Sequence, residues 1–145
     1  SACMTRLIYS GLFDKLPAIK IITHHFGGMI PFFAEKIGIG FQQIFAGDNE
    51  KNPLAEQAGL KKQPKEYFKM FYADTATNGS VAAAACGLEF FGADHSIFAT
   101  DAPFDPEGGT LLIRETIKAV ESLDIDAETR ARIYCGNLER LLKLA

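Results

Sequence analysis

The chain has 145 residues, of which 48% are hydrophobic and 23% are charged, and its formal net charge is -3. This much apolar material is enough for a single domain over residues 1–145, and it excludes a disordered tail or a small disulfide-held scaffold. Because the charge is small and no Lys/Arg block occurs, we expect a small-molecule ligand and no nucleic-acid or membrane partner.

The cysteines and the hydrophobic runs indicate a reducing, cytoplasmic location. Cys3, Cys86 and Cys135 are odd in number and have no CxxC spacing, so neither a disulfide framework nor a zinc knuckle is expected. No apolar run reaches the ~18 residues that a membrane span needs. The first residues also lack the basic-then-apolar order of a signal peptide.

The first half of the chain predicts a helix, a strand and a second helix. Apolar residues at helical spacing predict a helix over 5–16, which Pro17 ends. A β-branched run predicts a buried strand over 18–25 that leads into a glycine turn. The spacing after Pro31 predicts a helix to about 46, and polar residues over 47–65 predict an exposed excursion with a little helix near its end.

The second half continues this alternation. Residues 69–74 and 95–101 predict two more strands, separated by an alanine-rich helix over 79–91. Further helices are predicted over 107–123, 127–134 and 138–144. Strands separated by single helices predict an α/β fold with a parallel sheet. A sheet of three strands has two open edges, which something should cover.

Polar residues stand at the carboxyl end of each predicted strand. These residues are His24 and His25, then Asp74, then Asp101. Loops at this end of a parallel sheet converge, and they carry the binding and catalytic groups of such folds. Because side chains alternate along a strand, the two histidines are expected to point to opposite faces. His25 is the one expected to face the centre of the rim, because it precedes a glycine turn.

Each of these residues also has a purely structural interpretation. Either histidine could satisfy a buried hydrogen bond, and Asp101 could cap a helix or tie a loop. For Asp74 the structural interpretation is preferred, with Thr75 and Thr77 as local partners.

Other sequence features carry weaker signals. His95 precedes its strand and is expected to be a surface or capping residue. Gly108 and Gly109, at a predicted helix start, could receive an anion on free N–H groups. The GxxxxGK[ST], GxGxxG, GxSxG and HExxH patterns do not occur, which removes the common nucleotide, serine-hydrolase and zincin interpretations.

Four segments together resemble a known family. They read LPAIKIITHHFGGMIPF over 16–32, YADT over 72–75, FATDAPF over 98–104 and CGNLERLL over 135–142. In this order the chain resembles the amidohydrolase-related family that includes aminocarboxymuconate-semialdehyde decarboxylase and the resorcylate-type decarboxylases. The family fold is a (β/α)8 TIM barrel, and the resemblance implies that this chain is a partial barrel with the sixth to eighth strands and their helices.

The resemblance also implies roles for individual residues. His25 would be the acid/base or substrate-polarising histidine, and Asp101 would bind a divalent metal, zinc or manganese, with His25 as a possible second ligand. Asp74 and His24 would line the substrate pocket, and Asn137 would fix the final helix. The ligands that the family takes from its first and fifth strands have no counterpart here. Because a zinc site needs three protein ligands, the chain alone is expected to bind metal weakly or not at all.

The implied function is the C-terminal part of a metal-dependent decarboxylase or hydrolase for a small aromatic or unsaturated carboxylate, inactive as this chain alone. A different interpretation is a non-catalytic remnant that forms a homo-oligomer through its open sheet edges. A third is a flavodoxin-like domain that binds an anion near Gly108 and Gly109, which the missing phosphate loop disfavours.

Overall fold

The computed structural model describes residues 1–44 and 60–144, and its centre is one parallel sheet. The sheet order is β1 (Ile22–Thr23), β2 (Tyr72–Asp74), β3 (Ser96–Ile97). Ile22 pairs with Tyr72, and Ala73 pairs with Ser96. The predicted parallel α/β arrangement is therefore confirmed. Within the described residues β1 and β3 pair only with β2, so each has an open edge.

Two short helices replace the single helix predicted over 5–16. They are α1 (Ala2–Tyr9) and α2 (Leu12–Lys15), and Gly11 separates them with a φ of 70°. A residue in this left-handed region cannot continue a right-handed helix, and glycine adopts it without steric cost.

The first strand is shorter than predicted because the chain turns sharply after it. Pairing ends at Thr23, and the 3-10 turn η1 (His25–Gly27) follows. His25 and Phe26 both have positive φ, at 54° and 46°. The prediction that a strand runs through His25, with alternation placing His24 and His25 on opposite faces, is therefore wrong.

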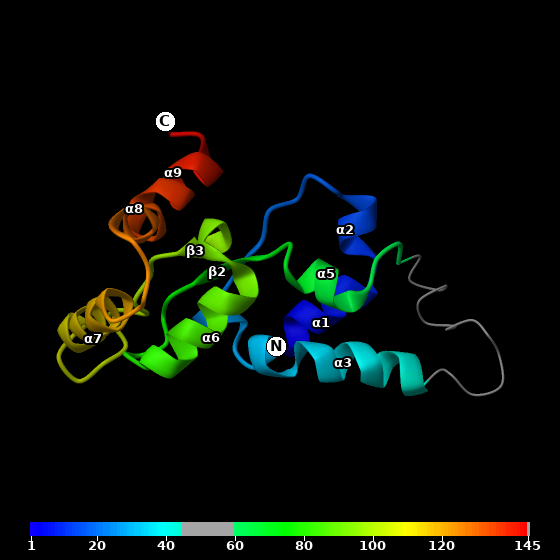
Figure 1. Cartoon of the computed structure of the whole chain (residues 1–145), viewed down its shortest axis with the longest axis horizontal. Coiled ribbons are helices and arrows are strands. Elements are labelled where there is room, and N and C mark those ends of the chain that lie inside the picture. Colours follow the sequence, from blue (N-terminus) through cyan, green and yellow to red (C-terminus); the bar gives the residue numbers. More distant parts are fainter. Residues whose placement is uncertain (45–59, 145) are drawn as a thin grey trace.

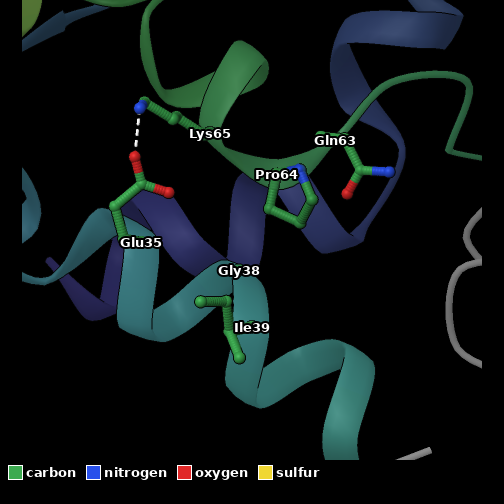
Figure 2. Close-up of a pocket in the computed structure, with 6 residues that line it drawn as sticks. All are labelled: Glu35, Gly38, Ile39, Gln63, Pro64 and Lys65. Carbon is green, nitrogen blue, oxygen red and sulfur yellow. Dashed lines mark hydrogen bonds and ion pairs between the residues drawn. The ribbon is translucent and has the colours of Figure 1, made fainter. Parts of the chain in front are cut away.

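The middle of the chain has two helices that pack on each other. These are α3 (Ile30–Ile44) and α5 (Pro64–Phe68), which confirms the predicted short helix at the end of the excursion. The predicted helix end at 46 and the excursion over 47–59 lie outside the described residues. Residues of both helices line a cavity of about 200 Å³, and two of them, Lys65 and Glu35, form an ion pair (Figure 2).

The remaining helices follow β2 and β3. They are α6 (Val81–Phe91), η2 (Ala93–His95), α7 (Thr110–Glu121), α8 (Ala127–Ala131), η3 (Arg132–Gly136) and α9 (Asn137–Leu142). Ser80 caps α6 by accepting from the Ala83 amide at 3.3 Å. The π-helical turn η3 joins α8 to α9 without the predicted interruption. None of the described helices is long and apolar enough to cross a membrane.

The strands lie between two groups of helices (Figure 1). Helices α1, α2, α3 and α5 gather on one side, α7, α8 and α9 on the other, and α6 contacts both α3 and α7. The fully buried side chains of Phe26, Ile30, Phe68 and Phe71 form the core beside β1 and β2. Burying an aromatic or branched side chain stabilises a fold by about 1.5–3 kcal/mol. The core therefore fixes the carboxyl ends of β1 and β2, where the polar residues lie.

Candidate functional site

The carboxylate of Asp74 joins the ends of β1 and β2. Asp74 ends β2 and is only 6% exposed. Its Oδ1 accepts hydrogen bonds from the backbone N–H of His25 at 2.7 Å and of Ala76 at 3.1 Å. Its Oδ2 lies 3.3 Å from Nδ1 of His24. Both histidines are thus held by one carboxylate.

The ring of His25 is fixed by a main-chain carbonyl. Its Nδ1 lies 2.6 Å from the Ala76 oxygen. A carbonyl oxygen only accepts, so Nδ1 must carry the proton and donate it. In the neutral ring, Nε2 then has the free lone pair. Because His25 is exposed, this nitrogen is available to a substrate or a metal ion.

Packing against α6 holds the turn that carries His25. The Phe26 ring is 2% exposed, and a Cβ added at Gly87 of α6 would lie 2.2 Å from its Cγ. Gly27 has a φ of 72°, and a Cβ there would lie 2.9 Å from the Phe91 ring. Glycine at 87 and 27 therefore permits the close approach of the turn to α6.

The chain after β3 stays attached to the end of β2. The Thr75 hydroxyl donates to the Ala99 oxygen at 3.0 Å and accepts from the Ala99 amide at 3.1 Å. Asp101 follows two residues later, partly exposed, with a φ of 65°. Within residues 1–44 and 60–144 its carboxylate has no hydrogen-bond or ion-pair partner, so the structural interpretation of Asp101 as a cap or loop tie does not describe it.

The site residues divide into a contacting group and one separate residue. His24, His25 and Asp74 are in contact, and the two imidazole rings lie 5.9 Å apart. Asp101 comes four residues after β3, which pairs with β2 on the side opposite β1. A hollow of about 290 Å³ between α1 and β1 is lined by His24 and His25 together with apolar side chains, and Asp101 does not line it.

The donor set fits a divalent metal only in part. His25 offers one imidazole nitrogen and Asp101 one carboxylate, which are donors that zinc and manganese accept. In the part of the chain that the structure describes, no three His, Cys, Asp or Glu side chains gather as a metal site. Both residues are therefore suited to be ligands of a site that other residues must complete.

The expected anion position at Gly108 and Gly109 is filled by the chain itself. Asp105 accepts from the amides of Glu107 at 2.7 Å and Leu112 at 3.3 Å. Desolvation by itself raises the Asp105 pKa, but the backbone N–H donors outweigh it and hold the pKa below the ordinary value of 3.8. This internal carboxylate contradicts the anion-binding interpretation of the start of α7.

Two positioning groups escaped the sequence analysis. The Ala76 carbonyl belongs to the main chain, so no residue type could have indicated it. The sequence predicts Thr75 only as a local partner of Asp74, whereas its hydroxyl binds Ala99.

His95 has a structural role, because its Nδ1 lies 3.0 Å from the Phe71 oxygen and its ring stacks on Tyr72. Asn137 ties α9 to the β3 region, donating to Ala93 and Ser96, both at 2.7 Å.

Comparisons with known proteins identify the family. Residues 2–144 match a family described as amidohydrolase, and the chain belongs to it. Over 140 residues it is 31% identical to a gamma-resorcylate decarboxylase from Polaromonas sp. strain JS666, covering 96% of this chain and 39% of the relative. The chain thus spans about two fifths of the length of this relative.

Solved structures give the same result. A dihydroxybenzoic acid decarboxylase from Polaromonas sp. JS666, with bound manganese and 2-nitroresorcinol, is 31% identical with a TM-score of 0.75, over 97% of this chain and 39% of that one. A 5-carboxyvanillate decarboxylase from Sphingomonas paucimobilis is 28% identical with a TM-score of 0.72, over 96% and 38%. Such relatives are TIM-barrel enzymes, so the three parallel strands are part of a barrel and the predicted partial barrel is confirmed.

Proposed function

We propose that this chain forms the C-terminal part of the active site of a metal-dependent decarboxylase that acts on a small aromatic carboxylate. The relatives are decarboxylases of such compounds, and one of them holds manganese. The proposal depends on one observation. The end of β2 is bonded to His25 on one side and to Ala99 on the other, so His25 and Asp101 follow the two strands that flank β2, at the same end of the sheet.

The two residues have different roles in this proposal. Asp101 would hold the metal, since its carboxylate has no partner within the described residues. His25 would hold or move a proton at Nε2, because Nδ1 is engaged by the Ala76 carbonyl. A bound divalent ion would supply positive charge that orients a substrate carboxylate or hydroxyl.

The proton balance of decarboxylation fits a histidine. The bond between the ring carbon and the carboxylate breaks, CO₂ leaves, and the electron pair stays on the ring carbon. That carbon must then take a proton. The protonated form of His25 can donate it from Nε2 and return to the neutral ring.

Two ligands at most come from this chain, so the remaining ones belong to parts of the barrel that it does not match. We therefore expect weak metal binding and no turnover by residues 1–145 alone. Either zinc or manganese suits the donor types, and the manganese of the Polaromonas relative favours manganese.

A chimera tests this function. Residues 1–144 would replace the matching 39% of the Polaromonas decarboxylase, and CO₂ release from 2,6-dihydroxybenzoate would be measured with Mn²⁺. We expect Mn²⁺-dependent turnover that His25→Asn and Asp101→Asn each remove. Asp124→Asn, an exposed aspartate outside the site, is the control and should keep full turnover. A folded, manganese-loaded chimera without turnover would contradict the proposal, and full turnover in both site variants would contradict the assigned roles.

A further inference from the structure

We propose that Asp74 is a positioning residue that fixes the orientation and the tautomers of both histidines and does not contact substrate. The inference rests on the proposed function in one respect, namely that His25 Nε2 is the working atom. It replaces the expectation that Asp74 lines the substrate pocket. Asp74 is not among the residues that line the hollow beside His24 and His25.

The burial and bonding of Asp74 leave it little capacity for a ligand. The residue is 6% exposed, and both of its carboxylate oxygens are engaged. Oδ1 receives two backbone N–H donors and Oδ2 faces the ring of His24. All three contacts are within the protein, and two of them are with the turn that follows β1.

The turn needs such an anchor because its backbone is unfavourable. His25 and Phe26 are consecutive non-glycine residues with positive φ, a region that L-residues seldom adopt. A hydrogen bond from an amide to an ionised carboxylate is stronger than one to a neutral acceptor. The 2.7 Å bond between the His25 amide and Asp74 therefore favours this turn over an extended continuation of β1.

The same carboxylate sets where both rings carry their protons. His24 Nδ1 faces the Asp74 Oδ2, so it carries a proton toward the carboxylate. His25 Nδ1 donates to the carbonyl of Ala76, and the amide of Ala76 is itself bound to Asp74. Both neutral rings consequently present an unprotonated Nε2.

The test uses this 145-residue chain with ¹⁵N-labelled histidine, under conditions where both rings are neutral. Long-range ¹H–¹⁵N spectra report which ring nitrogen carries the proton. In Asp74→Asn, the side-chain oxygen still accepts from the two amides, but the NH₂ group now donates to His24. We expect the proton of His24 to move from Nδ1 to Nε2, while His25 keeps its proton on Nδ1.

Asp74→Ala removes the anchor altogether. The His25 amide resonance should move upfield, and its ring should become a mixture of both tautomers. Asp124→Asn is the matched control and should leave both rings unchanged. An Asp74→Ala spectrum identical to that of the unmodified chain would overturn the proposal. If Asp74→Ala does not fold, Asp74→Asn decides alone, and an unchanged His24 tautomer would overturn it.

These readouts involve neither metal nor turnover, so they separate this inference from the proposed function. An inactive chimera together with the expected tautomers would reject the function and keep the positioning role. In an active chimera, Asp74→Ala should lower kcat by about 10–100-fold, comparable to the loss of the partners that orient histidines in metal sites, with little change in KM. Unchanged kcat would reject the positioning role and keep the function.

Discussion

The ring of Phe26 fills the space in which a side chain at Gly87 would stand. A Cβ at position 87 would lie between 2.2 and 2.5 Å from three Phe26 atoms, which is far inside van der Waals contact. Helix α6 therefore approaches the turn that carries His25 so closely that a side chain at position 87 has no room. The packing of the core and the geometry of the site depend on the same contact.

Gly87→Ala should destabilise the chain and disturb the site together. Overpacking of this kind costs about 1–3 kcal/mol. Urea unfolding measures the loss, and the His25 amide resonance reports the turn. The control is Gly40→Ala on α3, where nothing lies within 4 Å and alanine should stabilise the helix by about 0.5–1 kcal/mol. Equal unfolding free energies for the two variants would contradict the packing argument.

Asp105→Asn should lower the temperature of thermal unfolding by a few degrees at neutral pH, because it removes a charged acceptor from the start of α7. The pKa of Asp105 is below 3.8 in the folded chain, so its contribution is complete above that value and is lost as the pH falls below it. The difference from the unmodified chain should therefore shrink in acid. Asp124→Asn controls for the lost charge. A difference in unfolding temperature between Asp105→Asn and the unmodified chain that persists at pH values far below 3.8 would contradict this role of the Asp105 carboxylate.

Asn137→Asp should destabilise the chain strongly at neutral pH. Asn137 is fully buried, and its NH₂ group donates to two carbonyl oxygens. An aspartate has the same shape but would place a negative charge against both carbonyls, and an uncompensated buried charge costs about 3–5 kcal/mol. Arg140, which donates to the side-chain oxygen at 3.2 Å, would offset part of this cost. Asn137→Ala serves as the comparison, since it loses the bonds without adding charge. A smaller loss for aspartate than for alanine would contradict this account.

Asp101→Asn should change metal binding without changing stability. Asparagine tolerates the positive φ of 65° better than alanine does, and no partner of the carboxylate is lost within the described residues. Unfolding free energies should agree within about 0.5 kcal/mol. Added Mn²⁺ should broaden the resonances near His25 and Asp101 more than those near Asp124, and the substitution should remove both effects. Broadening near His25 that persists in Asp101→Asn would contradict the role of Asp101 as the residue that holds the metal.

Ile22→Lys should weaken any self-association of the chain. Ile22 lies on the open edge of β1 and is 43% exposed, and a lysine at a sheet edge opposes strand pairing. Sedimentation over a range of concentrations measures the effect. Ile113→Lys on α7 starts from the same 43% exposure and should leave association unchanged. If the unmodified chain is a monomer at every concentration, the homo-oligomer interpretation is wrong.

The order of elements could be predicted from the sequence because periodicity depends only on neighbouring residues. The helix over 79–91 matches α6 closely. The strand over 69–74 ends with β2 at Asp74 but starts too early, because β2 begins at Tyr72. The strands predicted over 18–25 and 95–101 are too long. A strand ends where its pairing with the neighbouring strand ends, and this pairing is not visible in the local sequence. Beyond Ile97 the Phe98 amide bonds to Ile133 of η3 instead of to a strand.

The candidate residues could be predicted, but their arrangement could not. His25, Asp74 and Asp101 stand at the ends of the predicted strands, which a pattern of apolar runs indicates. In the structure only Asp74 belongs to a strand, and Asp101 comes four residues after β3. The positive φ of His25 depends on an acceptor 49 positions away and on the room beside Gly87. Such tertiary contacts leave no local signal at residues 24 and 25.

The acceptor that orients the His25 ring is the peptide oxygen of Ala76. Every amino acid, proline included, carries that oxygen, so no exchange of side chain at position 76 deletes it. Substitutions at position 76 can therefore change the size and shape of the side chain there. The His25 ring still keeps its proton on Nδ1 as long as the backbone conformation at position 76 is unchanged.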